Sequence, residues 1–186
     1  MKLATWNINS VRLRKENVIK FLKKENIDII FLQETKTTDE FFPESFFYNN
    51  GYTHIYFRGE KSYNGVAVLS KLPLKNKSFH NFCNLNDTRH LKIELAKNII
   101  IHNFYVPAGG DVADIKLNPK FKYKIDFMNE MIEYLKKQVS KKNIILGDFN
   151  IAPFENDVWS HKSLLKEVSH TKIETDAFKN LLEKCS

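Results

Sequence analysis

The 186-residue chain contains little cysteine and glycine, and each shortage excludes a class of protein. Cys83 and Cys185 lie far apart and fit neither a metal-binding nor a redox spacing, so the sequence excludes a scaffold stabilised by disulfides or zinc. Only six glycines and a hydrophobic content of 42% argue against a disordered chain. The sequence therefore predicts a globular protein with an ordinary apolar core.

Long apolar runs and nucleotide-binding motifs are also missing. No run approaches the roughly 18 apolar residues of a membrane-spanning helix, and Asn7 and Asn9 interrupt the apolar region that a signal peptide would need. No GxxxxGK[ST] phosphate loop and no HExxH motif occurs, which leaves triphosphate binding by that loop and zinc hydrolysis unsupported. We expect a cytoplasmic protein without a membrane partner.

The residues that are present suit one domain spanning residues 1–186. Fifteen phenylalanines supply much of the predicted core. The formal net charge of +7, carried mostly by lysine, favours a polyanionic partner, although many basic proteins bind none.

Segments typical of strands and helices alternate along the chain. Strands are predicted at residues 2–8, 27–33, 53–58, 65–70, 90–95, 98–106 and 143–147, and helices at 15–25, at 117–140 and from Glu174 onward. The segment IDIIFLQ at 27–33 contains a short continuous apolar run, as in a strand buried on both faces. The helix at 117–140 carries apolar residues at alternating steps of four and three, which is typical of an amphipathic helix packed on a sheet.

Several apolar strands end in polar side chains that can accept or donate hydrogen bonds. They are followed by Asn7 and Asn9, by Gln33, Glu34 and Lys36, by Asn103 and Tyr105, and by Asp148 and Asn150. Ligands of α/β proteins collect at strand ends, where loops hold side chains on a rigid platform. Each residue alone has an ordinary explanation, as a solvated loop residue, a turn former or a packing residue, but their coincidence favours a site.

The residue types at these strand ends suit a phosphate-processing metal site. Glu34 and Asp148 are hard oxygen ligands of the kind that Mg²⁺ takes together with water and substrate phosphate. Asn7 and Asn150 can donate to phosphate oxygens without adding negative charge, and further donors come from Tyr105 and Lys36.

Five segments carry a resemblance to a known family. TWNINSVR, DIIFLQETK, NGVAVLS, HNFYVPAGG and ILGDFNIAP occur in the order and spacing of the exonuclease III family of apurinic/apyrimidinic endonucleases, within the endonuclease/exonuclease/phosphatase superfamily. The resemblance covers essentially the whole chain. It implies an α/β fold of four layers, in which two packed β-sheets are flanked by helices.

The resemblance also implies an activity and its partners. It implies Mg²⁺-dependent hydrolysis, with Mn²⁺ as an alternative ion, of phosphodiesters 5′ to abasic sites and at 3′ ends of double-stranded DNA, by a protein that is a monomer when complete. In this reading Glu34 holds the metal with help from Asn7, Asp148 activates the attacking water, and Tyr105 contacts the phosphate or the leaving group. The residues assigned to phosphate and DNA are Asn7, Asn150, Lys36 and Arg89, with Asn150 also catalytic, and Arg12, Arg58 and Lys61 are assigned to the rim of the site.

The sequence departs from the family pattern after GDFNIAP. The family continues to an acidic residue and a histidine, in strings of the form G-x-R-x-D-H and S-D-H, and neither string occurs here. We therefore expect the C-terminal third of the domain to be missing and its two-sheet fold to be incomplete. Three readings stay open: a nuclease of exonuclease III type weakened or inactivated by truncation, a non-catalytic DNA-binding remnant, and a phosphodiesterase that acts on a non-DNA phosphate.

Overall fold

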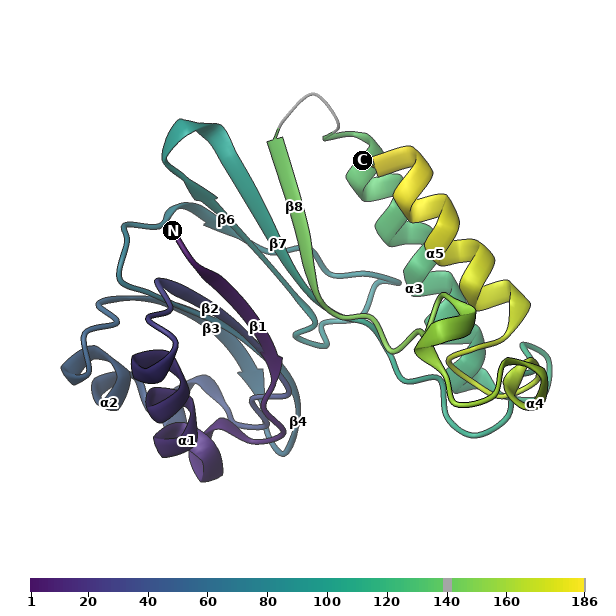
Figure 1. The fold of residues 1–186 in the computed structure, drawn as a ribbon, viewed down its shortest axis with the longest axis horizontal. Helices are drawn as coiled ribbons and strands as arrows, with labels where there is room; N and C mark the ends of the chain where they lie inside the picture. Colours follow the sequence, from purple (N-terminus) through teal and green to yellow (C-terminus); the bar gives the residue numbers. More distant parts are fainter. Residues whose placement is uncertain (139–141, 186) are drawn as a thin grey trace. The chain divides into compact units, whose positions relative to one another are not determined.

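The computed structural model describes residues 1–138 and 142–185 (Figure 1). The chain divides into two units. Unit 1 comprises residues 1–81, 86–105 and 142–148, and unit 2 comprises residues 82–85, 106–141 and 149–186. Both β-sheets belong to unit 1. The prediction that residues 1–186 form a single domain stays a prediction.

Sheet A has the strand order β1-β2-β4-β3. Its strands are β1 (Leu3–Asn7), β2 (Ile29–Gln33), β3 (His54–Glu60) and β4 (Tyr63–Ser70). Strand β1 pairs with β2 in parallel, because helix α1 (Val11–Lys24) returns the chain to the same edge of the sheet. The register places Asn7 opposite Gln33, so the C-terminal ends of these two strands lie side by side.

Sheet B has the strand order β5-β6-β7-β8. Its strands are β5 (Lys75–Ser78), β6 (His90–Leu95), β7 (Ile99–Tyr105) and β8 (Lys142–Asp148). Strands β7 and β8 are parallel, and their register places Tyr105 opposite Asp148. Each sheet therefore has one parallel pair that ends in polar residues.

Two apolar layers hold unit 1 together. Between the sheets, Ile29 and Phe31 of β2 belong to the same buried cluster as Leu91 and Ile101 of sheet B. All five residues of β2 are buried, which confirms the prediction of a strand covered on both faces. Burial of these side chains removes apolar surface from water, which stabilises the fold by about 25 cal/mol for each Å² buried.

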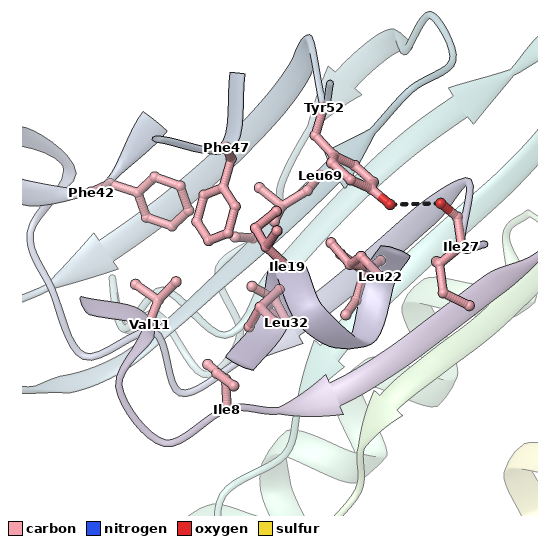
Figure 2. Close-up of a cluster of buried hydrophobic side chains, with 13 residues drawn as sticks. Ile8, Val11, Ile19, Leu22, Ile27, Leu32, Phe42, Phe47, Tyr52 and Leu69 are labelled. Carbon is pink, nitrogen blue, oxygen red and sulfur yellow. Dashed lines mark hydrogen bonds between the residues drawn. The ribbon is translucent and has the colours of Figure 1, made fainter. Parts of the chain in front are cut away.

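The second apolar layer lies on the other face of sheet A, under α1 and α2 (Glu44–Asn49) (Figure 2). The α1 residues Val18 and Leu22 are fully buried there together with Leu32 of β2. Tyr52 closes one end of the cluster, and its hydroxyl donates a hydrogen bond of 2.7 Å to the carbonyl oxygen of Ile27.

A buried amide network joins the two sheets beneath the strand ends. Asn103 of β7 is fully buried, and its Nδ2 donates to the carbonyl oxygens of Leu32 and Ala67 at 3.1 and 3.2 Å. Gln33 Nε2 donates to Asn103 Oδ1 at 2.7 Å and to Thr5 Oγ1 at 3.0 Å. Because unsatisfied amides are costly in a core, this network favours a single alignment of the sheets.

Unit 2 is built on two packed helices, α3 (Pro119–Lys136) and α5 (Lys172–Cys185), with the short helix α4 (His161–Leu164) between them in sequence. Helix α3 begins where Asn118 Oδ1 accepts the backbone N–H of Lys120, followed by a proline at the first helical position. The apolar stripe predicted for this helix is buried, including Phe121, Met128 and Ile132.

The fold class is confirmed as α/β, with two packed sheets flanked by helices. The predicted helix 117–140 ends earlier, at Lys136, and the end of the predicted range at 139–140 lies outside the described residues. The sequence reading missed α2, α4 and β5, besides the 3₁₀ turns Asp39–Phe41, Ala96–Asn98 and Glu155–Asp157. Within the described residues, no helix combines the length and apolarity needed to cross a bilayer.

Two stacked histidines on sheet B make the fold sensitive to acid. His90 Nε2 and His102 Nδ1 lie 3.0 Å apart, and both side chains are fully buried. Burial, reinforced by neighbouring positive groups, holds the pKa of His90 well below 6.5 and lowers the pKa of His102 to about 3.

We therefore expect stability to fall as pH drops from 6.5 toward 3. Above pH 6.5 these histidines are neutral in both the folded and the unfolded state. Below pH 6.5 they become protonated in the unfolded chain but stay neutral in the folded chain, so protons stabilise the unfolded state. The slope should be on the order of 1 kcal/mol per pH unit for each histidine. Urea titrations across this range would measure it. The double variant His90→Gln/His102→Gln should flatten the slope and the matched control His54→Gln should not, whereas equal slopes would contradict the assignment.

Candidate active site

The parallel strand pairs of both sheets end at one cluster of polar side chains in unit 1. Asn7 ends β1, Glu34 follows β2, Tyr105 ends β7 and Asp148 ends β8. These are four of the residues that the sequence singled out, and they come from positions as far apart as 7 and 148. Parallel pairing brings the ends of β1 and β2 together in sheet A and those of β7 and β8 together in sheet B. Packing of the two sheets then joins the two pairs, as the Asn7–Asp148 and Tyr105–Glu34 hydrogen bonds show.

The side-chain amide of Asn7 bridges two carboxylates. Its Nδ2 donates to Glu34 Oε1 at 2.7 Å and to Asp148 Oδ2 at 2.7 Å. The two carboxylate oxygens therefore lie within two hydrogen-bond lengths of each other, one carried by each sheet. Asn7 Oδ1 accepts the backbone N–H of Asn9 at 3.2 Å, which fixes the amide in this orientation.

Glu34 is held in a strained backbone conformation by its neighbours. Its φ is +54°, in the left-handed region that a glutamate adopts rarely and at a cost of about 1 kcal/mol or more. Its carbonyl oxygen accepts the N–H of Ser10 at 2.7 Å, and the next N–H, that of Thr35, donates to the carbonyl of Gly65 at 3.2 Å. A Cβ at Gly65 would lie 2.0 Å from Thr35 Oγ1, so the NGV segment leaves the space that this turn requires.

The Glu34 carboxylate is ionised at neutral pH. Burial alone would raise its pKa, but hydrogen bonds from Asn7, Lys36 and Tyr105, together with the charge of Lys36, outweigh burial and hold the pKa below its ordinary value of 4.5. Lys36 Nζ lies 2.7 Å from Glu34 Oε2 and donates to Asn9 Oδ1 at 2.7 Å. Lys36 remains about a third exposed, so its ammonium is accessible beside the carboxylate.

Tyr105 enters the site as a hydrogen-bond donor. Its hydroxyl donates to Glu34 Oε1 at 3.0 Å. Burial and the adjacent Glu34 carboxylate raise the pKa of the Tyr105 phenol far above neutral pH, so the phenol keeps its proton.

Arg89 braces Tyr105 from behind. Its guanidinium lies 4.7 Å from the centroid of the Tyr105 ring, donates to the Tyr105 carbonyl at 3.3 Å and is ion-paired with Asp87 at 2.6 Å. Only 4% of Arg89 is exposed. In this structure its visible role is to position the tyrosine, and its predicted contact with DNA stays a prediction.

The predicted rim residues lie in varied surroundings. The Arg58 guanidinium stacks on the exposed Phe79 ring at 3.6 Å and donates to Asn81 and Asn86. Arg12 lies 5.8 Å from the ring centroid of Phe41. Lys61 is exposed in the turn between β3 and β4. Their assignment to DNA stays a prediction.

Asn150 belongs to unit 2, so the structure does not group it with the carboxylates. Its φ is +50°, its Nδ2 donates to the carbonyl of Val106 at 2.8 Å, and its own carbonyl accepts from Lys124 at 2.6 Å. Its predicted contact with phosphate stays a prediction. Sequence reasoning placed Asn9 among the polar residues at strand ends without giving it a role of its own, although it accepts from Lys36 Nζ. It missed Lys124, because a lysine on an amphipathic helix carries no pattern that separates it from an ordinary surface residue.

The donor set in unit 1 fits a hard divalent cation. Glu34 supplies an ionised oxygen ligand and Asp148 a second carboxylate, and the Asn7 amide holds the two together. Across residues 1–138 and 142–185 there is no group of three or more His, Cys, Asp or Glu side chains arranged to hold a metal. Mg²⁺ needs no such group, since one or two carboxylates with water and substrate phosphate complete its shell.

Comparison with known proteins places this geometry in context. The model of the endonuclease/exonuclease/phosphatase family matches residues 4–171. The exodeoxyribonuclease III of Haemophilus influenzae is 33% identical over 169 residues, which cover 85% of this chain and 60% of that protein.

Two solved structures are similar over 98% of this chain and 70% of their own. An AP endonuclease from Archaeoglobus fulgidus matches with a TM-score of 0.89 and 34% identity. The 3′ phosphatase NExo from Neisseria, bound to product DNA hairpin, matches with a TM-score of 0.90 and 29% identity. The chain thus spans 60% of the length of the Haemophilus influenzae relative.

Proposed function

The chain belongs to the endonuclease/exonuclease/phosphatase family, and from this premise we propose that it hydrolyses phosphodiester bonds of DNA with the help of a divalent metal ion. The observation that carries the proposal is the Asn7 amide, which bridges the carboxylates of Glu34 and Asp148 at 2.7 Å each. A pair of carboxylates held this close, with protonated donors around it, suits the activation of water against a phosphate.

The proposed substrate is double-stranded DNA, cleaved 5′ to abasic sites and at 3′ ends. The relatives named as exodeoxyribonuclease III, AP endonuclease and 3′ phosphatase support it, as does the net charge of +7. We also propose that the complete protein is a monomer and acts in the cytoplasm.

Each side chain then has a task that its surroundings support. Glu34 is ionised and would hold the metal, proposed to be Mg²⁺ with Mn²⁺ as an alternative, and Asn7 aligns Glu34 with Asp148. The bound ion would polarise the phosphate and lower the pKa of a coordinated water. Asp148 accepts a proton from the attacking water, since it is the second carboxylate of the bridge.

The donors complete the proposed mechanism. Tyr105 keeps its proton and donates to the phosphate or to the leaving oxygen. The Lys36 ammonium supplies positive charge beside Glu34, and Asn150 donates its amide to the phosphate. Because Tyr105 and Lys36 are held against Glu34 before substrate arrives, they stabilise charge on the phosphate oxygens at little reorganisation cost.

A strand-nicking assay tests the proposal. The purified chain is incubated with an end-labelled duplex that carries one abasic site, with Mg²⁺ or with EDTA, beside an intact duplex with a recessed 3′ end. Mg²⁺-dependent nicking 5′ to the abasic site, or shortening from the 3′ end, is the expected result. DNA retention that weakens with salt but yields no product would replace the proposal by a DNA-binding role. Neither product nor DNA affinity at low salt would overturn both roles and favour a non-DNA phosphate.

A further inference from the structure

A fully buried ion pair links the two main helices of unit 2. Lys124 of α3 and Glu174 of α5 lie 2.5 Å apart, and neither side chain has any exposed surface. Burying two charges costs several kcal/mol each before their attraction repays it, and apolar residues of similar size usually serve stability equally well. Stability alone therefore does not explain this ion pair, and its other contacts indicate a second role.

Lys124 also donates hydrogen bonds to backbone carbonyls of two loops. Its Nζ donates to the carbonyl oxygen of Asn150 at 2.6 Å and to that of Ala108 at 3.2 Å, and lies 3.5 Å from Ser169 Oγ. In sequence, Ala108 comes three residues after Tyr105 and Asn150 two residues after Asp148. One ammonium thus ties together the two segments that leave β7 and β8.

Glu174 anchors this ammonium from the other side. Its Oε1 accepts the N–H of Ser169 at 2.9 Å, and its Oε2 accepts the N–H and the hydroxyl of Thr171 at 3.1 and 2.6 Å. The carboxylate is therefore fixed at the start of α5 and holds Lys124 in one position. A fixed carboxylate and an extended lysine give the two loop carbonyls a rigid common donor.

The loops have the features of segments that need such an anchor. Asn150 has a φ of +50°, a strained conformation that persists only where its surroundings determine it. Its side chain ties the same two segments together, since Nδ2 donates to the Val106 carbonyl at 2.8 Å. Gly109 makes room for the lysine stem, because a Cβ there would lie 2.9 Å from Lys124 Cδ.

We propose that Lys124, held by Glu174, is a positioning residue that fixes the backbone at Asn150 and Ala108 and so sets the orientation of the Asn150 amide. The proposal rests on the proposed function for its kinetic consequence, because Asn150 is assigned there to the phosphate. Its structural part, the anchoring of the Asn150 turn, stands independently of any activity.

The test separates anchoring from stability by replacing both charges. The variant Lys124→Met/Glu174→Leu keeps apolar volume in place of the buried pair but removes the donor of the two loop carbonyls. Its matched control is Lys122→Met/Asp126→Leu, which removes the exposed pair Lys122–Asp126 from the same helix. The amide of Ala152, bonded to the Ser169 carbonyl at 2.8 Å, reports the order of the Asn150 turn.

We expect hydrogen exchange at Ala152 to accelerate by about tenfold or more in the buried-pair variant and to stay unchanged in the control. In the nicking assay kcat should fall between about 10-fold and 100-fold while KM changes little, because the defect lies in the placement of a group that acts on the transition state. A merely structural role would change unfolding without this kcat effect.

Each other outcome has a defined meaning. Exchange and kcat within about twofold of the control would overturn the inference. If the wild-type chain shows no nicking, the proposed function fails, and exchange at Ala152 alone decides the anchoring. If the double variant does not fold, Glu174→Gln, which keeps the shape and removes the charge, is measured against the control in the same way.

Discussion

Glu34→Gln is expected to lower the rate of metal-dependent DNA nicking by about 10³-fold without unfolding the chain. The substitution keeps the shape of the side chain, so Asn7 and Tyr105 still find an oxygen acceptor where they now meet Oε1. It removes the charge that the surrounding donors hold in place, and with it the anionic ligand for the metal. Single-turnover nicking of the abasic duplex measures the loss, and calorimetric titration with Mg²⁺ measures metal affinity.

The matched control is Glu40→Gln, which neutralises an exposed carboxylate of the same unit. It changes the net charge equally, so a general electrostatic effect on DNA binding would appear in both variants. We expect the control to retain its rate and metal affinity. Equal rates for Glu34→Gln and wild type would remove Glu34 from the metal site and with it the proposed mechanism.

The bridge through Asn7 also predicts that Glu34 and Asp148 act as one unit. Asp148→Asn should cost about as much as Glu34→Gln, and the double variant should lose little beyond the larger single loss, since groups that act together are not additive. Strictly additive losses in the logarithm of the rate would indicate two independent sites. The nicking assay on the two single variants and the double variant distinguishes these results.

The elements that the sequence predicts well are those with a local cause. Strand β2 is apolar from Ile29 to Leu32 because both of its faces are covered, and α3 shows its helical repeat because one face is covered. Helix α2 and strand β5 were missed for the converse reason. Only Phe47 is buried in α2, and β5 is a short strand of polar residues of which none is buried, so neither carries an apolar period.

The candidate site also has a part that the sequence could predict and a part that it could not. That polar residues at strand ends would collect follows from parallel pairing, which a sequence can suggest. The bridging of Glu34 and Asp148 by one amide cannot be predicted, because it depends on contacts across 27 and 141 residues of chain. The surroundings of Arg89 could not be predicted either. An arginine in a basic protein is ordinarily exposed, but this one is ion-paired with Asp87 and stacks against Tyr105.

Gly147→Ala should destabilise the chain by on the order of 4 kcal/mol and abolish the site. Gly147 has a φ of +138°, and a Cβ there would lie 1.9 Å from the carbonyl oxygen of Phe104. That oxygen belongs to the backbone of the neighbouring strand, where Phe104 is the register partner of Gly147, so no side chain can rotate out of the way. Relief requires β7 and β8 to separate at the point where they present Tyr105 and Asp148.

The matched control for this substitution is Gly51→Ala, because Gly51 also has a left-handed φ, of +93°, but open space around its Cβ position. Backbone strain alone should cost about 1 kcal/mol there, so the difference between the two variants isolates the clash with β7. Urea unfolding measures both losses, and near-ultraviolet circular dichroism of the tyrosines reports whether the strand end is intact. Equal losses of unfolding free energy at the two positions would mean that β7 and β8 can separate at little cost. That result would contradict the claim that rigid strand ends hold the active-site residues in place.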